Sequence, residues 1–123
     1  MSTPFLEDGH IYGVCSYGQL RCLSLKTGKR IWEDLRATGS TGNVRTQTDR
    51  WSNAFIVKHE NRFFISNEKG DLIIAKLDKV GYHEISRVNL IKPTNPMAGR
   101  DVVWSHPAFA HQRVYLRNDK EMI

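Results

Sequence analysis

Two short segments of the sequence carry the side chains best suited to binding chemistry. The segments TDRWS (48–52) and GRDVVWS (99–105) each combine an arginine, an aspartate and a tryptophan. Arginine and aspartate engage charged or polar groups, and tryptophan offers a flat apolar face together with one hydrogen-bond donor. The candidate binding residues are therefore Arg50, Trp51, Arg100, Asp101, Trp104 and His106.

Catalysis and metal binding are less well supported by these residues. Asp101 with His106 could form a general base or part of a metal site, but a hydrolase also needs an activated nucleophile, and no Gly-x-Ser-x-Gly motif occurs. The five histidines stand singly, without a His-x-x-x-His pair. We assign no catalytic and no metal-binding residue. A structural interpretation also stays open, in which the tryptophans anchor loops and each Arg–Asp pair is a local ion pair.

The bulk composition describes a globular domain or part of one. The chain has 123 residues, of which 40% are hydrophobic and 25% charged, with a net charge of +5. This charge favours acidic partners modestly, but no block of five or six like charges occurs, so nucleic-acid binding is not expected.

Neither a transmembrane run nor a signal peptide is visible in the sequence, so no membrane span is expected. The compartment stays open, and it would be periplasmic or extracytoplasmic if a longer form carries a signal peptide. Cys15 and Cys22 are too few for a disulfide framework or a four-ligand zinc site. They are either two free thiols or one cross-strand disulfide.

The elements that must position the candidate residues follow from an internal repeat. Segments 3–25, 53–77 and 106–123 share one pattern of a phenylalanine, a polar turn, an apolar-aromatic pair, a second turn and an apolar run. Tyr12 to Phe64 is a step of 52 residues, and Phe64 to Tyr115 is a step of 51. A period near 50 residues that contains only short elements indicates the blades of a β-propeller.

Each complete period predicts a four-stranded antiparallel meander. Alternating β-branched and aromatic residues separated by turn signals predict strands at 3–7, 10–16, 19–25 and 29–34, and again at 53–59, 62–67, 71–78 and 83–90. No segment has helical periodicity. We expect an all-β chain of about two and a half blades in an incomplete ring. The blades span 1–34 and 52–90, the partial blade spans 105–123, and the connecting loops span 35–51 and 91–104.

The segment CLSLKTGKRIW (22–32) resembles the tryptophan-docking repeat of PQQ-like β-propellers, roughly Ala-x-Asp-x-x-x-Gly-x-x-x-Trp. The segments FISNEKGDLIIAKL (64–77) and WSHPAFAHQRVYLRNDKE (104–121) look like those of uncharacterised bacterial members of this class. Gly28 and Trp32 match the repeat, while Cys22 and Ser24 replace the alanine and the aspartate. In the second period Ala75 and Gly81 match, whereas Leu77 and Ile85 stand at the aspartate and tryptophan positions. The resemblance implies that Trp32 packs between neighbouring blades and that Gly28 and Gly81 are structural.

The resemblance indicates a fold more specifically than a function, since propellers serve as enzymes, assembly factors and adaptors. In a meander the second turn of each blade shares a face with the blade-to-blade connections, so we expect the candidate residues at the mouth of the channel. The favoured function is a non-catalytic scaffold that binds proteins or ligands, or self-associates through open blade faces. The alternative is a fragment of a PQQ-dependent dehydrogenase. The resemblance implies that such a dehydrogenase would hold PQQ with vicinal cysteines and acidic calcium ligands. Neither pattern occurs in this sequence, so no cofactor is predicted.

Overall fold

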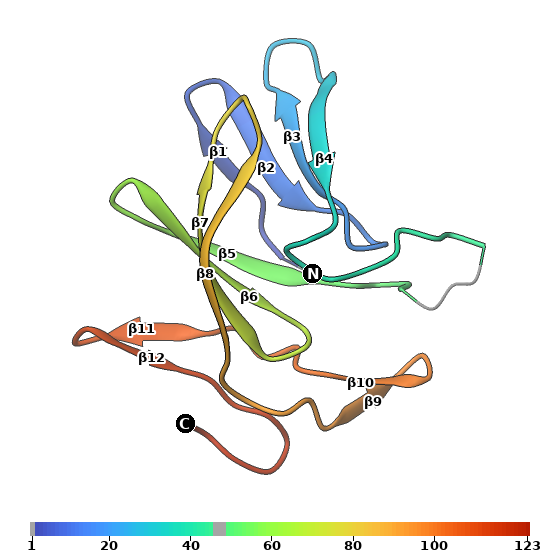
Figure 1. The fold of residues 1–123 in the computed structure, drawn as a ribbon, viewed down its shortest axis with the longest axis vertical. Coiled ribbons are helices and arrows are strands. Elements are labelled where there is room, and N and C mark those ends of the chain that lie inside the picture. The colour runs from blue at the N-terminus through green and yellow to red at the C-terminus, as the bar shows by residue number, and fades with distance from the viewer. Residues whose placement is uncertain (1, 46–48) are drawn as a thin grey trace.

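A computed structural model describes residues 2–45 and 49–123, and within these residues the chain is all-β, without a helix (Figure 1). The first sheet, called sheet 1, is formed by β1 (Phe5–Glu7), β2 (His10–Val14), β3 (Leu20–Ser24) and β4 (Arg30–Asp34). Sheet 2 is formed by β5 (Ala54–His59), β6 (Arg62–Asn67), β7 (Asp71–Leu77) and β8 (Tyr82–Asn89). Both sheets are antiparallel in chain order, which confirms the two predicted four-stranded meanders.

The turns explain why these strands pair in this order. Asp8 and Gly9 have φ angles of 49° and 73°, and His111 and Gln112 have 49° and 60°. Two central residues with positive φ are the geometry of a tight two-residue hairpin, whose twist matches that of the flanking strands. At the second turn of sheet 2, Gly70 has a φ of 85°, and a Cβ there would overlap the Ile91 carbonyl. Only glycine fits at this position.

The C-terminal part contains two small hairpins. One pairs β9 (Asn95–Met97) with β10 (Arg100–Val102), and the other pairs β11 (Ala108–Ala110) with β12 (Arg113–Tyr115). The first hairpin lies inside the predicted connection 91–104, for which the sequence analysis expected no strand. The strand β9 contains Pro96, and a two-stranded ribbon has free edges that tolerate a residue without an N–H. Residues 46–48 of the other predicted connection lie outside the described residues.

Interface 1, between sheets 1 and 2, holds most of the buried apolar side chains. Phe63 is 2% exposed and meets the edge of the Phe5 ring at 5.2 Å between centroids. Trp32 packs beside this cluster and its Nε1 donates to the Asp78 carbonyl of sheet 2 at 2.7 Å. The cluster comprises Tyr12, Leu20, Cys22, Ala37, Ala54, Phe63, Ile65, Ile73, Ala75, Leu77 and Tyr82. Burying each large side chain contributes about 1.5–3 kcal/mol, so interface 1 is the core of the structure.

The two glycines that the sequence analysis assigned a structural role differ in conformation. Gly28 has a φ of 69° and its N–H donates to the Ser24 carbonyl at 2.8 Å, so this turn uses the left-handed region that glycine favours. Gly81 lies outside that region, and its N–H donates to Asp78 Oδ1 at 3.1 Å. The turn at Gly28 therefore depends on glycine, whereas the turn at Gly81 is held by the Asp78 carboxylate.

Interface 2 lies on the opposite face of sheet 2, against β11 and β12. Phe64 of β6 meets Phe109 at 5.2 Å between ring centroids. The buried cluster here contains only Ile91, Val103 and Leu116, with Leu90 and Val114 beside it. Interface 2 therefore buries far fewer apolar side chains than interface 1.

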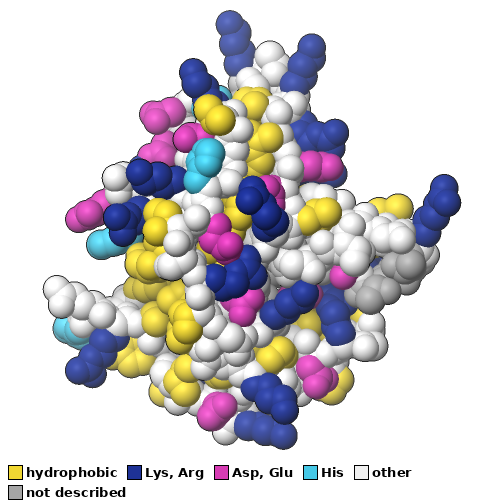
Figure 2. Space-filling model, viewed as in Figure 1, with side chains coloured by type: hydrophobic (Ala, Val, Ile, Leu, Met, Phe, Trp, Pro, Cys, Tyr) yellow, Lys and Arg dark blue, Asp and Glu magenta, His cyan; other side chains and the backbone are white. Residues whose placement is uncertain are grey.

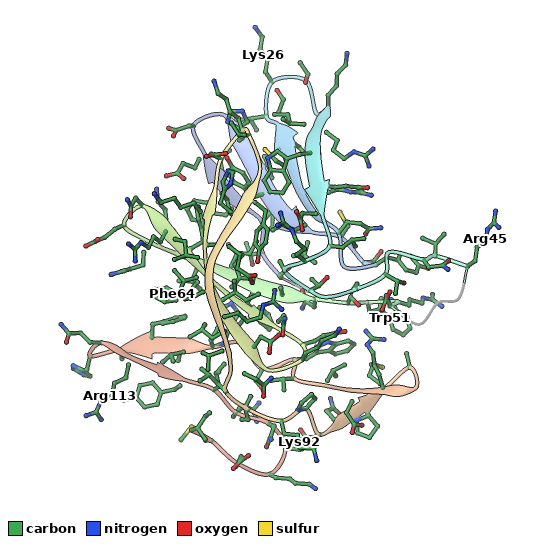
Figure 3. The ribbon with its side chains drawn as sticks, in the orientation of Figure 1. Lys26, Arg45, Trp51, Phe64, Lys92 and Arg113 are labelled. Carbon is green, nitrogen blue, oxygen red and sulfur yellow. The ribbon has the colours of Figure 1, made fainter. Side chains whose placement is uncertain are left out.

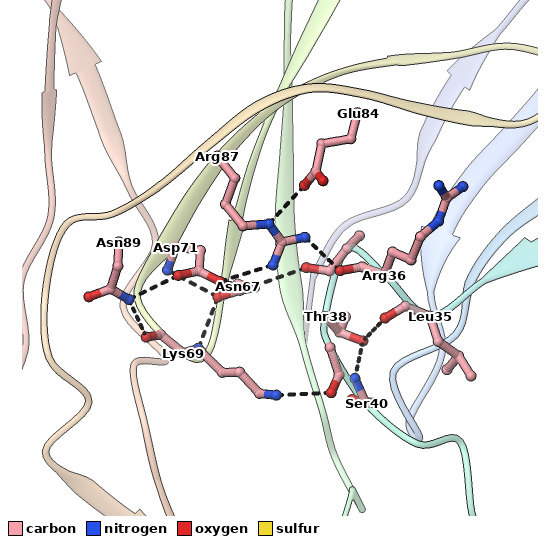
Figure 4. Close-up of polar contacts among 12 residues, drawn as sticks. Leu35, Arg36, Thr38, Ser40, Asn67, Lys69, Asp71, Glu84, Arg87 and Asn89 are labelled. Carbon is pink, nitrogen blue, oxygen red and sulfur yellow. Dashed lines mark hydrogen bonds and ion pairs between the residues drawn. The ribbon is translucent and has the colours of Figure 1, made fainter.

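In the second and third repeats, an asparagine side chain hydrogen-bonds to the connection that precedes that repeat, and we call this contact a joint. In the first joint, Asn67 Nδ2 donates to the Ala37 carbonyl at 3.0 Å and Asn67 Oδ1 accepts from the N–H groups of Lys69 and Asp71 (Figure 4). In the second joint, Asn118 Nδ2 donates to the Lys92 carbonyl at 2.8 Å, and Asn118 Oδ1 accepts from two N–H groups of the following turn. Asn67 and Asn118 are 51 residues apart. A tertiary contact therefore recurs with the same period as the strands.

Candidate functional site

A buried carboxylate, Glu68, organises the candidate site. It follows β6 in the second turn of sheet 2 and is 3% exposed. Its two oxygens accept from Arg100 Nε at 2.9 Å and from Arg100 Nη2 at 3.1 Å. They also accept from Trp104 Nε1 at 3.0 Å and from Ser52 Oγ at 3.3 Å. A buried charge is stable only when it is paired and hydrogen-bonded, and Glu68 meets both conditions.

The backbone of Glu68 also joins the second turn of sheet 2 to segments 50–53 and 100–104. Its N–H donates to the Asn53 carbonyl at 3.2 Å, and its carbonyl accepts from the Val103 N–H at 2.7 Å. Segment 50–53 precedes β5, and segment 100–104 precedes β11, so both predicted chemical segments are held against the second turn of sheet 2.

Four of the six predicted site residues meet around this turn. Arg100 and Trp104 bind Glu68 directly, and Arg100 Nη2 also donates to the Arg50 carbonyl at 3.0 Å. The Arg50 guanidinium lies over the Trp51 ring, 4.4 Å from its centroid, which is the geometry of a cation–π contact. The sequence therefore identified two arginines and two tryptophans that the fold brings together.

Asp101 and His106 are placed elsewhere. Asp101 is exposed on β10 opposite Pro96 and borders a separate shallow pocket near Asn118. His106 is exposed, its ring contacts the Phe55 ring at 4.5 Å between centroids with the planes tilted by 45°, and its Nδ1 lies 3.0 Å from the Pro107 carbonyl. The interpretation of a local Arg100–Asp101 ion pair is wrong, because Arg100 pairs with the buried Glu68.

A groove of about 380 Å³ opens beside the Glu68 cluster, and we call it the rim groove. Its apolar walls are Val14, Trp51, Met97 and Trp104, and its polar lining includes Ser2, Cys15, Ser16, Ser52 and Asn53. Ser2 precedes β1, Trp51 precedes β5 and Trp104 precedes β11. The segments that enter the first strand of three successive units therefore converge on one groove. Its volume and its mostly apolar walls are those of ligand-binding sites.

Trp51 is the most unusual residue of the rim groove. Its φ is 62°, in the left-handed region that bulky side chains rarely adopt, yet 46% of its surface is exposed. Such a conformation costs about 1–3 kcal/mol and persists only when its surroundings impose it. Figure 3 shows Trp51 near β9 and β10, on the opposite side of the molecule from Phe64. Strained, exposed side chains of this kind concentrate at functional sites.

The carboxylate of Asp49, which stands two residues before Trp51, is held by hydrogen bonds. Burial tends to raise the pKa of Asp49, but hydrogen bonds from Thr41 and Gly42 and the positive charge of Arg100 hold the pKa below its ordinary value. The Thr41 N–H donates to Asp49 Oδ2 at 2.6 Å. Asp49 is therefore ionised at neutral pH and serves to fix the connection that leads to Trp51.

Sequence analysis missed Glu68, Asn53 and Cys15 as site residues. Glu68 stands in a Glu-Lys-Gly turn, which is typical of exposed surface, and its equivalents in the other repeats are Ser16 and Asp119. No sequence pattern separates a buried carboxylate in such a turn from an exposed one. The asparagine joint had a visible signal, since Asn-Glu-Lys (67–69) and Asn-Asp-Lys (118–120) recur at the period of the repeat.

The remaining expectations concern thiols, metals and membranes. Both cysteines are free, because Cys22 is buried opposite Tyr12 while Cys15 borders the rim groove. Within residues 2–45 and 49–123, no group of three His, Cys, Asp or Glu side chains is arranged to hold a metal ion. The same residues contain no helix of the length and apolar character needed to cross a membrane.

In comparisons with known proteins, no family model matches the chain, and no curated protein matches it.

Proposed function

We propose that this chain is part of a β-propeller built from PQQ-like repeats, and that it acts as a non-catalytic scaffold that holds a partner or ligand in the rim groove. Two complete meanders at a step of 52 residues and two asparagine joints at a step of 51 support the propeller. Trp32 also supports it, because this docking-motif residue bridges the two sheets through the Asp78 carbonyl.

One observation carries the functional part of the proposal. Trp51 and Trp104 come from two different connections and line the same groove, next to the entry to β1. A rim on which successive repeats present aromatic side chains is suited to binding, because the repeated scaffold holds the loops in place.

The chemistry of the cluster supports binding rather than catalysis. Both oxygens of Glu68 are engaged by Arg100, Trp104 and Ser52. A general base needs an oxygen directed at a substrate proton, whereas this carboxylate is directed at the protein's own donors. Glu68 is therefore a positioning residue that orients Trp104 and Arg100.

The test is affinity capture from an extract of the source cells with the full chain as bait. We compare the wild type with the double variant Trp51→Ala, Trp104→Ala and with Val80→Ala, whose side chain is 74% exposed in the turn between β7 and β8. Circular dichroism verifies that each variant is folded. We expect the double variant to lose at least ten-fold of the captured partner while Val80→Ala retains it. Equal capture by all three proteins would refute the proposal.

The open sheet faces support self-association as a second mode of interaction. Leu6 is 58% exposed on sheet 1, and Ile85 and Val88 of β8 are 48% and 51% exposed. Figure 2 shows hydrophobic side chains at the surface in a band on one side of the molecule, with Lys and Arg distributed around its outline. Exposed apolar side chains of this size favour association. Sedimentation velocity should detect oligomers at high concentration, and a monomer throughout would contradict this mode.

A further inference from the structure

The ligand class of the rim groove follows from Asn53, the buried polar side chain of its lining that makes no hydrogen bond to a described residue. Asn53 is 9% exposed and lines the groove, and no hydrogen bond joins its side-chain amide to any described residue. No fully buried side-chain nitrogen or oxygen of the described residues lacks a partner, so the Asn53 amide must reach the water in the groove. A buried amide that keeps its donor and acceptor free is available to a ligand.

The tryptophan rings on the walls are oriented before any ligand arrives. Trp104 is fixed by its hydrogen bond to Glu68, and Trp51 by its backbone conformation and by Arg50 over its ring. Rings that are already in place lose little conformational freedom on binding, and this strengthens the binding of an apolar group of the ligand between them.

We propose, on the basis of the proposed function, that the rim groove binds an extended peptide segment of a partner protein. One bulky apolar side chain of the peptide enters between Trp51 and Trp104, and the peptide backbone hydrogen-bonds to the amide of Asn53. In an extended peptide the N–H and the carbonyl of one residue point to the same side, and they match the acceptor and the donor of the asparagine.

Other ligand classes fit the groove less well. A carbohydrate needs several fixed polar partners, whereas of the polar lining Ser52 already binds Glu68 and Ser16 is exposed. An anionic cofactor needs a dedicated cation, and Arg100 is already paired with Glu68. A volume of about 380 Å³ accommodates one or two side chains and excludes a folded element.

Electrostatics add a preference for the residues that flank the apolar side chain. The chain has a net charge of +5, and the Arg50 guanidinium lies over the ring of Trp51, which lines the groove. The net positive charge of the chain attracts acidic segments and accelerates their association. The peptide therefore carries Asp or Glu next to its apolar anchor.

Fluorine NMR of the full chain labelled with 5-fluorotryptophan tests the proposal. The chain has three tryptophans, of which Trp51 and Trp104 line the groove while Trp32 lies at interface 1 and serves as an internal control. The probe is the blocked peptide acetyl-Asp-Phe-Asp-amide, compared with acetyl-Asp-Ala-Asp-amide, acetyl-Lys-Phe-Lys-amide and free indole.

We expect the first peptide to shift the Trp51 and Trp104 signals at millimolar concentration and to leave Trp32 unchanged. The alanine and lysine peptides should bind at least five-fold more weakly. Asn53→Ala should weaken binding at least five-fold, as for two lost hydrogen bonds, while Asn95→Ala on exposed β9 should not. The exposed Trp51→Ala substitution provides a second variant, read at Trp104, because it removes no core side chain.

Three results would overturn the peptide assignment: no shift at either groove tryptophan, equal shifts with the alanine peptide, or stronger binding of free indole than of the peptide. Combined with a loss of capture by the tryptophan double variant, each would leave the binding scaffold intact and change only the class of ligand. If capture were also unchanged, the proposed function itself would fail.

Discussion

Interfaces 1 and 2 are built from the same repeated elements but are stabilised in different ways. Interface 1 joins two complete sheets through an apolar cluster that includes Phe63, whereas interface 2 joins sheet 2 to a two-stranded hairpin and leaves a groove of about 520 Å³ beside Phe64. Polar contacts of Glu68 with Arg100 and Trp104, and of Asn118 with the Lys92 carbonyl, add to the connection at interface 2. The repeat therefore fixes where contacts form, and the number of strands fixes how much apolar surface they bury.

Two adjacent phenylalanines provide the largest test of this difference. Phe63 and Phe64 follow each other on β6, so their side chains point to opposite faces, toward interface 1 and interface 2 respectively. Phe63→Ala should lower the free energy of unfolding by about 3–5 kcal/mol, and Phe64→Ala by about 1–2 kcal/mol. Urea unfolding of both variants measures this, and equal losses would show that the two interfaces are equally packed.

Glu68→Gln should give the next largest effect. The substitution leaves the Arg100 guanidinium, which is 18% exposed, without its carboxylate, and it weakens the hydrogen bond from Trp104. Breaking such a pair should cost about 2–3 kcal/mol. Urea unfolding is compared with Glu121→Gln, an exposed control that should change stability by less than about 0.5 kcal/mol. A neutral Glu68→Gln would mean that Glu68 does not hold the second connection.

The asparagine joints should differ more modestly. Asn67 is 1% exposed and Asn118 is 8% exposed, and the Nδ2 of each donates to a backbone carbonyl of the preceding connection. Asn67→Ala should cost about 2 kcal/mol and Asn118→Ala about 1 kcal/mol, because the more deeply buried partner groups lose more when left unpaired. Thermal unfolding measures both variants, and the reverse order would contradict the dependence of the two joints on burial.

Acid should weaken the first joint at a pH where the second is unaffected. Burial tends to raise the pKa of Asp71, but hydrogen bonds from Asn89 and Asn67 and the positive charge of Arg87 hold this pKa below its ordinary value of 3.8. The stabilisation is therefore present above pH 3.8 and is lost as the pH falls through the lower pKa of the folded state. Asp71→Asn should reduce the loss of stability below about pH 4. The corresponding position of the second joint is Met122, which does not titrate.

Most of the sheets could be predicted from the sequence, whereas only part of the site could. All eight strands of sheets 1 and 2 lie where alternation and turn residues such as Asp8-Gly9 place them, because these signals are local. The convergence of Arg50, Trp51, Arg100 and Trp104 followed from the turns of a meander. Glu68 could not be predicted, because its burial depends on contacts with segments more than 30 residues away.

Hydrogen exchange of the three tryptophan indole N–H groups tests the whole arrangement most directly. Trp32 donates to the Asp78 carbonyl at interface 1, Trp104 donates to Glu68 at the rim, and Trp51 is 46% exposed and has no indole hydrogen bond to any residue that the structure describes. We expect exchange to be slowest for Trp32, intermediate for Trp104 and fast for Trp51. If Trp104 exchanged as fast as Trp51, Glu68 would not hold it, and the preformed rim groove would be contradicted.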